Sequence, residues 1–377
     1  MLLKERLREK ALELGFEDVG FTNVEPLDLY IKEIESRPKK MYGWVQTNRF
    51  NTVRAAAIAE KHPWAKSLVV LIRNYHRRAF PPQLIGKIGR CYQVDERKEK
   101  GSEHQRLMEY FKFIKGERIR LWFDGELPAR MSAARAGIVT YGKNCFVYAG
   151  KSMMGASWLE SIPLIIDARI EPDEPTIEVG CPEWCKNACI AACPTGALYA
   201  PKKMNPLLCI AFNSYYGEGL TPMELREPMG TWVYGCDRCQ AVCPRNQPWM
   251  NQALPGNPQL EARASDFELT TLLSMSEDHY VNKVWPLTFY ISRKKVSKWK
   301  MNAARALGNL GARDNVPALI NAMTGSPHDI VRGMSAWALG RLGGSRAKTA
   351  LKAQKNKENG IVKVEIEQAL SSPLYGK

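Results

Sequence analysis

Several motifs that define common enzyme classes are missing from this chain of 377 residues. No GxGxxG follows a predicted strand and neither GxxxxGKS nor GxxxxGKT occurs, so neither a Rossmann dinucleotide site nor a P-loop is predicted. No apolar run approaches the ~18 residues that a membrane-spanning helix needs. With 45% hydrophobic and 25% charged residues, the composition is that of an ordinary soluble protein.

Histidine is scarce, and no signal sequence is recognisable. The five histidines stand apart from one another: His62, His76, His104, His279 and His328. A lone histidine is more often a structural residue than a ligand, so none is assigned a role. The opening MLLKERLREKALELGF carries charges throughout and predicts an amphipathic helix, with Leu3, Leu7, Ala11 and Leu14 on one face. A cytoplasmic location is expected, where thiols stay reduced.

Cysteine, by contrast, is concentrated in two short runs. CPEWCKNACIAACPTGAL begins at Cys181, and CDRCQAVCPRN begins at Cys236. With one cysteine between them, the runs give eight thiols: Cys181, Cys185, Cys189, Cys193, Cys209, Cys236, Cys239 and Cys243. Iron bridged by sulfide prefers thiolate ligands, and each 4Fe-4S cluster takes four. The eight thiols therefore predict two 4Fe-4S clusters.

The Cys-Pro endings and the PTGAL segment resemble bacterial two-cluster ferredoxins, in which the last cysteine of a run serves the other cluster. That resemblance implies one cluster on Cys181, Cys185, Cys189 and Cys243, and a second on Cys193, Cys209, Cys236 and Cys239. The first run is spaced C-x3-C-x3-C-x3-C, looser than the usual C-x2-C-x2-C-x3-C, which leaves open whether Cys181 is a ligand. Zinc also uses paired cysteines, but seldom with Cys-Pro endings, and disulfides need an oxidising compartment.

The formal charge of +15 is concentrated near the C-terminus. From Ser292 to Lys377, sixteen Lys and Arg stand against five Asp and Glu. Five of the basic residues lie close together: Arg293, Lys294, Lys295, Lys298 and Lys300. Each phosphate that such residues neutralise releases counterions, so this region predicts a contact with a nucleic-acid backbone. A merely solvated basic face is the alternative.

The first 178 residues alternate between predicted strands and helices. Strands are predicted around Val19 and Phe21 and at 67–75, 118–123, 146–149 and 162–170, with helices at 103–114 and 128–137. This alternation predicts a mixed domain of the α/β or α+β class, and α+β is the fold class expected for the whole chain. A ferredoxin-like double-cluster domain is predicted to follow at 179–250, and connecting helices at 251–295.

Residues 296–377 form a fourth, helical part with an internal repeat. ARALGNLGARDNVPALINAM and SAWALGRLGGSRAKTALKAQ align at an offset of 32 residues, so that Leu307 and Gly308 match Leu339 and Gly340. This period is typical of paired-helix solenoids and most like short HEAT repeats. Two copies bury too little on their own, so we expect them to dock on the preceding part of the chain.

Together these parts resemble the epoxyqueuosine reductase family, which shares its core with cobalamin-dependent reductive dehalogenases. The resemblance covers nearly the full length, including GFEDVGFTNVEPL, HPWAKSLVVLIRNY, ARAGIVTYGKN and both cysteine runs. It implies that the domain at 1–178 binds base-off cobalamin beside the nearer cluster. It also implies an oxidoreductase that reduces epoxyqueuosine in a tRNA anticodon loop to queuosine, with electrons from an external low-potential donor.

The resemblance further implies roles for single residues. The acid of the family is an aspartate shortly after a strand, and FDGELP places Asp124 there. The implied cobalamin contacts are Arg54, Gly142, Lys143, Asn144 and Asp237. Each of these residues also has a structural interpretation; Asp124, for example, suits a turn before a glycine. The tRNA would bind through the basic C-terminal region, and a monomer without membrane contact is expected.

The sequence departs from the family in two places. The typical GWxGK segment reads VTYGK, and the DYH that usually follows GKIxRY is replaced by CYQVDERKEKGSEH. The second segment lies near the substrate in the resemblance, so a small molecule is an alternative substrate, undergoing dehalogenation or alkene reduction. A non-catalytic two-cluster electron carrier that binds RNA is a third hypothesis, although 178 N-terminal residues are far more than a carrier needs.

Overall fold

The computed structural model describes residues 2–48, 50–93, 101–150, 155–288 and 290–371. The chain forms two compact units, each assembled from separate segments. The first unit comprises Met1–Arg77, Val94–Pro206 and Arg238–Leu254, and the second comprises Arg78–Gln93, Leu207–Asp237 and Pro255–Lys377. Part of the segment in which the family resemblance fails, residues 94–100, lies outside the described residues. The four predicted domains along the sequence stay a prediction.

A four-stranded sheet organises the first unit, with all neighbouring strands antiparallel in the order β1-β2-β6-β3. The strands are β1 (Asp18–Thr22), β2 (Ser67–Asn74), β3 (Leu121–Trp122) and β6 (Leu159–Ile166). Every residue of β2 is buried, as expected of a central strand covered on both faces. The predicted mixed α and β fold is confirmed, although β3 is shorter than the predicted strand at 118–123.

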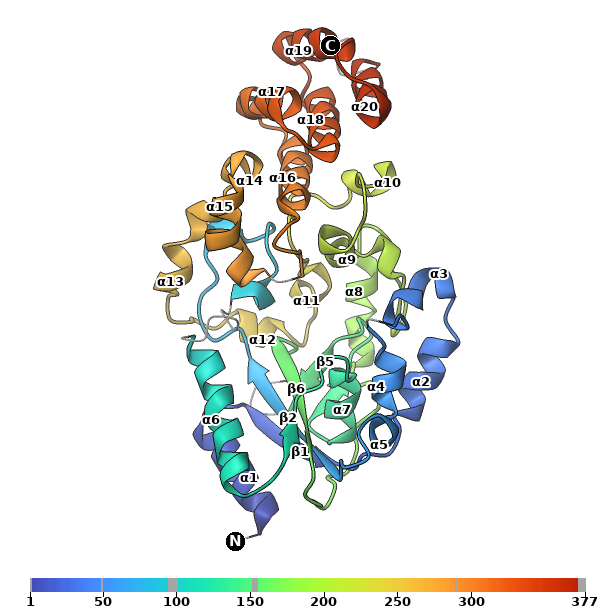
Figure 1. The fold of residues 1–377 in the computed structure, drawn as a ribbon, viewed down its shortest axis with the longest axis vertical. Coiled ribbons are helices and arrows are strands. Elements are labelled where there is room, and N and C mark those ends of the chain that lie inside the picture. Colours follow the sequence, from blue (N-terminus) through green and yellow to red (C-terminus); the bar gives the residue numbers. More distant parts are fainter. Residues whose placement is uncertain (1, 49, 94–100, 151–154, 289, 372–377) are drawn as a thin grey trace. The chain divides into compact units, whose positions relative to one another are not determined.

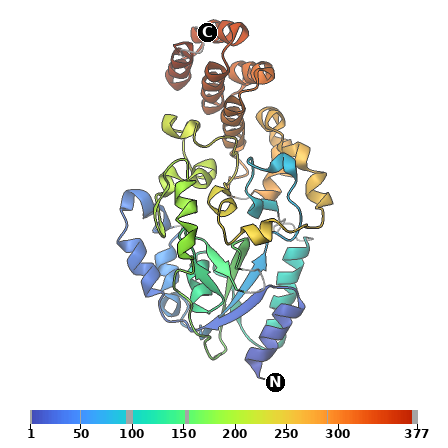
Figure 2. The same ribbon diagram turned by 180° about the vertical axis from the view of Figure 1, so that it is seen from behind.

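Helices cover both faces of this sheet. On one face α1 (Leu3–Glu13) and α6 (Ser102–Gly116) lie side by side (Figures 1 and 2) and bury apolar side chains against the strands. Leu7 and Ala11 of α1 pack there, as the predicted amphipathic face requires. On the other face, α7 (Ala129–Arg135) approaches β1 so closely that a Cβ at Gly20 would lie 2.3 Å from the Ala136 carbonyl oxygen.

The remaining elements of the first unit are short. They are α2 (Asp28–Glu35), α3 (Lys39–Tyr42), α4 (Thr52–Ala56), α5 (Ile58–Lys61), α8 (Ala188–Ala191), α11 (Arg238–Ala241) and α12 (Gln247–Met250), with two hairpins, β4 (Val139–Tyr141) with β5 (Val147–Ala149) and β7 (Leu198–Ala200) with β8 (Lys203–Met204). Helices α8 and α11 carry cysteines of the two runs and pack against each other. The first unit therefore holds most of the predicted cluster ligands.

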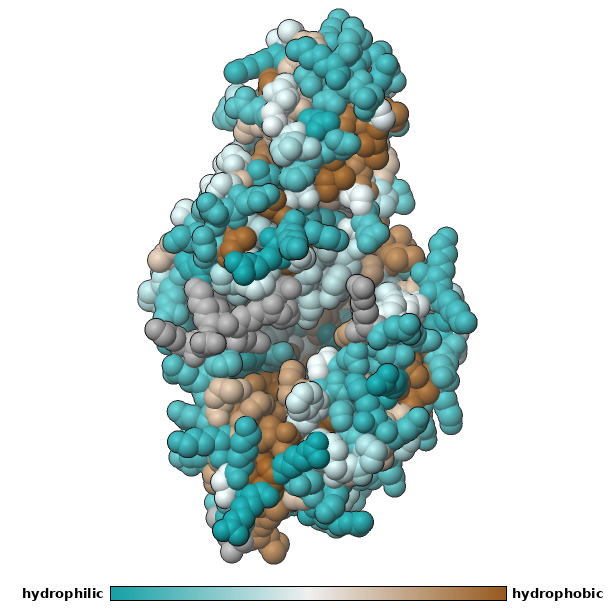
Figure 3. All heavy atoms as spheres, viewed as in Figure 1, coloured by the Kyte–Doolittle hydropathy of each residue, from teal (hydrophilic) through white to brown (hydrophobic). Residues whose placement is uncertain are grey.

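The second unit is helical. Its described helices include α9 (Ile210–Tyr215), α10 (Met223–Arg226), α13 (Pro258–Glu261), α14 (Leu269–Ser274), α15 (Glu277–His279), α16 (Val296–Leu310), α17 (Val316–Gly325), α18 (Asp329–Leu342), α19 (Ser345–Lys355) and α20 (Gly360–Leu370). Helices α16, α18 and α20 pack in succession (Figure 1), as expected for helical repeats. The visible surface at the top of the repeats, around α19, is largely hydrophilic, and apolar side chains gather below it on one side (Figure 3).

The first repeat helix, α16, docks through polar side chains as well as apolar ones. Lys298, Asn302, Arg305 and Asn309 recur at helical spacing and donate hydrogen bonds to backbone carbonyls between Ser214 and Val233. The expected docking of the repeats on the preceding chain is thus observed within this unit. The grouping of Lys298 with exposed basic residues was wrong, because its side chain is buried and its Nζ donates to the Gly217 carbonyl at 2.6 Å.

Arg293, Lys294 and Lys295 are exposed, so they are available to bind a phosphate backbone. No helix among those described has both the length and the apolar character needed to cross a membrane.

Candidate active site and metal centre

Four cysteines from the two runs line one pocket in the first unit. Cys181, Cys185 and Cys189 come from the first run and Cys243 from the second. Lys143, Asn144 and Tyr148, from the β4–β5 hairpin and its turn, line the same pocket. The fold therefore brings together the four thiols that the ferredoxin resemblance assigns to one cluster, including Cys181.

The backbone of the first run explains how its looser spacing still aims the thiols at one point. Lys186 and Asn187, between Cys185 and Cys189, both have left-handed backbone conformations, with φ of 46° and 59°. Two such residues in succession reverse the chain sharply before α8 begins. The extra residue between Cys185 and Cys189 is therefore taken up by this reversal.

The second run is anchored by a buried amide network. The Asn246 side chain donates to the Gln240 carbonyl at 2.8 Å and accepts from the Ser157 N–H at 2.8 Å. The Gln240 amide in turn donates to the Ser157 carbonyl at 3.0 Å. These bonds tie α11 and the following turn to the segment before β6, and thereby fix the position of Cys243.

The thiols accept hydrogen bonds from the hairpin. The Lys143 backbone N–H lies 3.3 Å from Cys181 Sγ, its Nζ lies 3.8 Å from Cys185 Sγ, and the Tyr148 hydroxyl lies 3.1 Å from Cys243 Sγ. Donors of this kind around cluster sulfurs are one means by which proteins tune a cluster's reduction potential.

The four thiols of the pocket also favour a positively charged metal group on electrostatic grounds. Burial, followed by the neighbouring thiols of Cys243 and Cys181, raises the pKa of Cys189 to about 11. Thiolates crowded in this way repel one another unless metal ions compensate their charge, and a coordinating thiol is deprotonated by its metal. The pocket therefore favours a compensating positive charge over four free thiolates.

The other four cysteines are divided between the units. Cys193 and Cys239 belong to the first unit, where the Cys239 carbonyl accepts a hydrogen bond from Asn144 at 3.2 Å. Cys209 and Cys236 belong to the second, where Cys209 immediately precedes α9 and Cys236 packs against the apolar cluster of Ile210. Their assignment to a second cluster stays a prediction.

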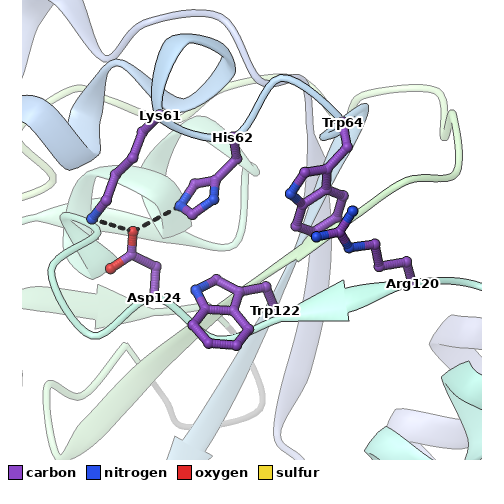
Figure 4. A pocket seen from close by; sticks show the side chains of 6 residues that line it. All are labelled: Lys61, His62, Trp64, Arg120, Trp122 and Asp124. Atoms are coloured by element: carbon purple, nitrogen blue, oxygen red, sulfur yellow. Dashed lines mark hydrogen bonds and ion pairs between the residues drawn. The ribbon is translucent and has the colours of Figure 1, made fainter.

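Asp124 lies in a separate cavity of about 390 Å³ in the first unit (Figure 4). The cavity is lined by Lys61, His62, Trp64, Arg120, Trp122 and Asp124. Asp124 follows β3, whereas Lys61 and His62 stand at the C-terminal end of α5. Asp124 Oδ2 lies 2.7 Å from Lys61 Nζ and 3.0 Å from His62 Nε2. The two segments thus form a cluster of one carboxylate and two bases.

The turn interpretation of Asp124 is also borne out. Asp124 Oδ1 accepts the Glu126 backbone N–H at 3.0 Å, as an aspartate in an Asx-turn does. Burial alone would raise the pKa of this carboxyl, but the hydrogen bonds from Lys61, His62 and the Glu126 N–H outweigh it and lower the pKa below its usual value. Asp124 is therefore ionised at neutral pH in this conformation.

Aromatic side chains form the rest of the cavity. The Arg120 guanidinium lies over the Trp64 ring, 4.0 Å from its centroid. Trp122 and the adjacent Phe123 expose 55% and 48% of their surface, which is unusual for two successive large apolar residues. Flat, exposed aromatic faces beside a charged cluster are suited to stacking against a planar group.

Two segments of the chain match known domain families. Residues 181–246 match the 4Fe-4S double cluster binding domain, and residues 294–371 match HEAT repeats. Both the predicted iron-sulfur domain and the predicted repeats are thereby confirmed.

Whole-chain relatives share one name. Epoxyqueuosine reductase of Bacillus subtilis (strain 168) is 29% identical over 98% of this chain and 95% of its own length, and that of Escherichia coli (strain K12) is 26% identical over 98% and 97%. A structure of the Bacillus subtilis enzyme, with its catalytic loop swung out of the active site, superimposes with a TM-score of 0.81 at 28% identity, covering 98% of both chains. Over nearly its full length, the chain is therefore similar to epoxyqueuosine reductases in both sequence and fold. It is an oxidoreductase, as the resemblance implies.

A second structure in this family was determined with a tRNA-Tyr stem loop carrying epoxyqueuosine. It superimposes with a TM-score of 0.79 at 27% identity and covers 100% of this chain and 99% of its own.

The residues predicted to contact cobalamin have different surroundings. Arg54 is exposed on α4, and Lys143 contacts Cys181 and Cys185 as described. Gly142 has a packing role, because a Cβ there would lie 2.3 Å from the Tyr148 ring. The Asn144 amide donates to the Tyr148 hydroxyl at 2.9 Å. Asp237, in the second unit, is buried and accepts from the Arg90 backbone and guanidinium.

Sequence reasoning missed Lys61 and His62. It treated every histidine as isolated because it compared positions along the chain, whereas His62 meets Asp124 across 62 residues. One signal was available: KHPW places two bases and an aromatic residue together directly before a buried strand.

Proposed function

We propose that this protein reduces epoxyqueuosine to queuosine in tRNA, with two 4Fe-4S clusters and cobalamin as cofactors. The observation that carries the proposal is the full-length match to an epoxyqueuosine reductase structure bound to an epoxyqueuosine-modified tRNA stem loop. The reaction opens the epoxide and removes its oxygen as water. It consumes two electrons and two protons and leaves a carbon–carbon double bond.

Electrons would enter through the clusters. We assign Cys181, Cys185, Cys189 and Cys243 to one cluster, supported by their common pocket, and Cys193, Cys209, Cys236 and Cys239 to the other. Lys143 and Tyr148 would then stabilise reduced cluster sulfur through their hydrogen bonds.

Cobalamin would supply a strongly nucleophilic, low-valent metal centre when bound. Of the five predicted contacts, Arg54 and Lys143 fit best, since Arg54 is exposed and the Lys143 side chain reaches the pocket of the first cluster. Asn144 and Asp237 would act indirectly, because their polar atoms already hold Tyr148 and Arg90 in place.

Asp124 would be the proton donor to the substrate oxygen. It lies on the loop after β3. The similar Bacillus subtilis structure has its catalytic loop swung out of the active site. The exposed Trp122 beside it would stack against a base of the anticodon loop, because single-stranded RNA is commonly recognised by aromatic stacking.

The proposal is tested by turnover of a defined substrate. Protein reconstituted with iron, sulfide and cobalamin without oxygen would be mixed with a low-potential reductant and an epoxyqueuosine-containing stem loop. Mass spectrometry of the nucleosides should show loss of one oxygen atom. Retention of ~8 irons and one cobalamin without turnover would instead favour a small-molecule substrate, and ~8 irons without cobalamin an electron carrier.

A further inference from the structure

Proton supply at Asp124 poses a chemical problem that the structure helps to solve. Each turnover of the proposed reduction breaks two C–O bonds of the epoxide and forms two O–H bonds, so two protons must reach the departing oxygen. Asp124 is a single carboxyl group, and its contacts keep it ionised at neutral pH. A second group must therefore hold protons beside it and deliver them on demand.

Lys61 is a poor candidate for that second group. Its Nζ lies 2.7 Å from Asp124 Oδ2 and 2.6 Å from Glu126 Oε2, so two carboxylates share its charge. Burial acts to lower the pKa of Lys61, but the hydrogen bonds to Asp124 and Glu126 raise it above the usual lysine value. A base with so high a pKa retains its proton, so Lys61 serves to fix Asp124 in place.

His62 has the properties that Lys61 lacks. Its Nε2 lies 3.0 Å from the same oxygen, Asp124 Oδ2, within the distance of direct proton transfer. Histidine is the side chain whose ordinary pKa lies near neutral pH, so it can both lose and regain a proton there.

The surroundings of His62 give it access to solvent protons. Its ring lines the cavity of about 390 Å³, and its side chain is 14% exposed. The Trp64 ring flanks it edge-on at 6.1 Å between centroids and limits how the imidazole can turn. The charged groups near the ring are Asp124, which it contacts, Lys61 and Arg120, which line the same cavity, and Glu126, which pairs with Lys61.

We propose that His62 is the residue that recharges Asp124 with protons during turnover. Protonated His62 transfers its Nε2 proton to Asp124 Oδ2, and Asp124 passes it to the epoxide oxygen. Neutral His62 takes a new proton from solvent through the cavity, and a second transfer completes the water molecule. The two electrons come from the external donor through the clusters. This role rests on the proposed function and makes His62 a positioning and relay residue.

The first test replaces His62 with glutamine. His62→Gln keeps a side-chain N–H that can donate to Asp124 but cannot exchange a proton near neutral pH. Turnover of the epoxyqueuosine stem loop should fall by at least about 10-fold, with unchanged affinity for the stem loop. The fall in wild-type rate as the pH rises through the histidine range should disappear from the variant's profile. His279→Gln, at the end of α15 and outside the cavity, should behave as the wild type in both respects.

The second test does not depend on turnover. In cluster-loaded protein without substrate, the carboxyl of Asp124 can be titrated by carbon-13 NMR. Because the His62 hydrogen bond helps to lower the pKa of Asp124, that pKa should be higher in His62→Ala than in the wild type. Added imidazole should restore both the lower pKa and part of the turnover, since the cavity can admit a free ring.

The outcomes separate the two proposals. If His62→Gln turned over the stem loop at the wild-type rate and with the wild-type pH profile, the relay would be overturned. An Asp124 pKa that is the same in His62→Ala as in the wild type would also overturn it. A reconstituted wild type that leaves the epoxide intact would instead remove the proposed function itself.

Discussion

The charged cluster around Asp124 gives this residue a structural role beside the catalytic role proposed for it. Its Oδ1 caps a turn through the Glu126 N–H, and its Oδ2 pairs with Lys61 and His62. Because these contacts all favour the carboxylate, we expect a change at this position to affect stability as well as the proposed proton transfer.

Asp124→Asn should lower the turnover rate by about 10²- to 10⁴-fold, because an amide cannot pass on a proton. Iron and cobalamin content should be unchanged. Rates with the stem loop and metal analysis of the same preparation check this, with the exposed Asp28→Asn as control. Full activity in Asp124→Asn would exclude Asp124 as the acid.

The same substitution should make stability depend on pH. The pKa of Asp124 is lowered in the folded state, so its stabilisation is complete above the pKa of the unfolded chain and is lost as the pH falls through the folded value. Asp124→Asn should therefore lower the free energy of unfolding by about 1–3 kcal/mol at neutral pH and by little in strong acid. Denaturant unfolding at several pH values measures the difference.

The cluster ligands can be tested one residue at a time. Cys185→Ala removes a thiol from the pocket of the first cluster, so iron content should fall from ~8 to ~4 per chain. Cys91→Ser, outside both runs, should retain the full complement. Iron and sulfide assays on anaerobically reconstituted protein decide the matter, and unchanged iron in Cys185→Ala would count against the assignment.

At the scale of elements, α16 links the helical repeats to the chain that carries Cys209 and Cys236. Its buried Arg305 donates to the carbonyls of Gly230 and Trp232, and burial lowers the pKa of that guanidinium to about 9. The buried charge is tolerated because the guanidinium donates hydrogen bonds to these carbonyls.

Arg305→Met should therefore destabilise the second unit by about 2–4 kcal/mol, since it leaves buried carbonyls without donors. The midpoint of denaturant unfolding should fall accordingly. Arg313→Met removes the same charge from an exposed turn and should leave the midpoint nearly unchanged. Equal midpoints for the two variants would mean that the α16 contacts contribute little.

At the scale of the whole molecule, the net charge of +15 favours a polyanionic partner. The exposed Lys294 and Lys295 are suitable positions for testing this partner, because their replacement should not disturb the fold. Replacing the buried Lys298 would change the stability of the fold instead.

Lys294→Gln with Lys295→Gln should weaken tRNA binding and reduce the slope of log affinity against log salt by about 2. Lys39→Gln with Lys40→Gln removes the same charge from exposed positions on α3 and serves as the matched control. Binding isotherms at several salt concentrations provide both values. Identical slopes for the two double variants would remove this segment as an RNA contact.

The sequence by itself determined the features that depend on local pattern. Ligand spacing identified the iron-sulfur domain, the apolar run at β2 identified the central strand, and the offset of 32 identified the repeats. Such features are visible because short-range geometry imposes a period on the residues that satisfy it.

Only the tertiary structure decided which distant residues meet. It paired Asp124 with Lys61 and His62, and it turned Lys298 inward although its charge suggested an exposed position. It also brought Cys243 beside the first cysteine run. Contacts of this kind depend on how strands and helices pack across long separations, and a buried polar residue is stable only where that packing supplies its partner.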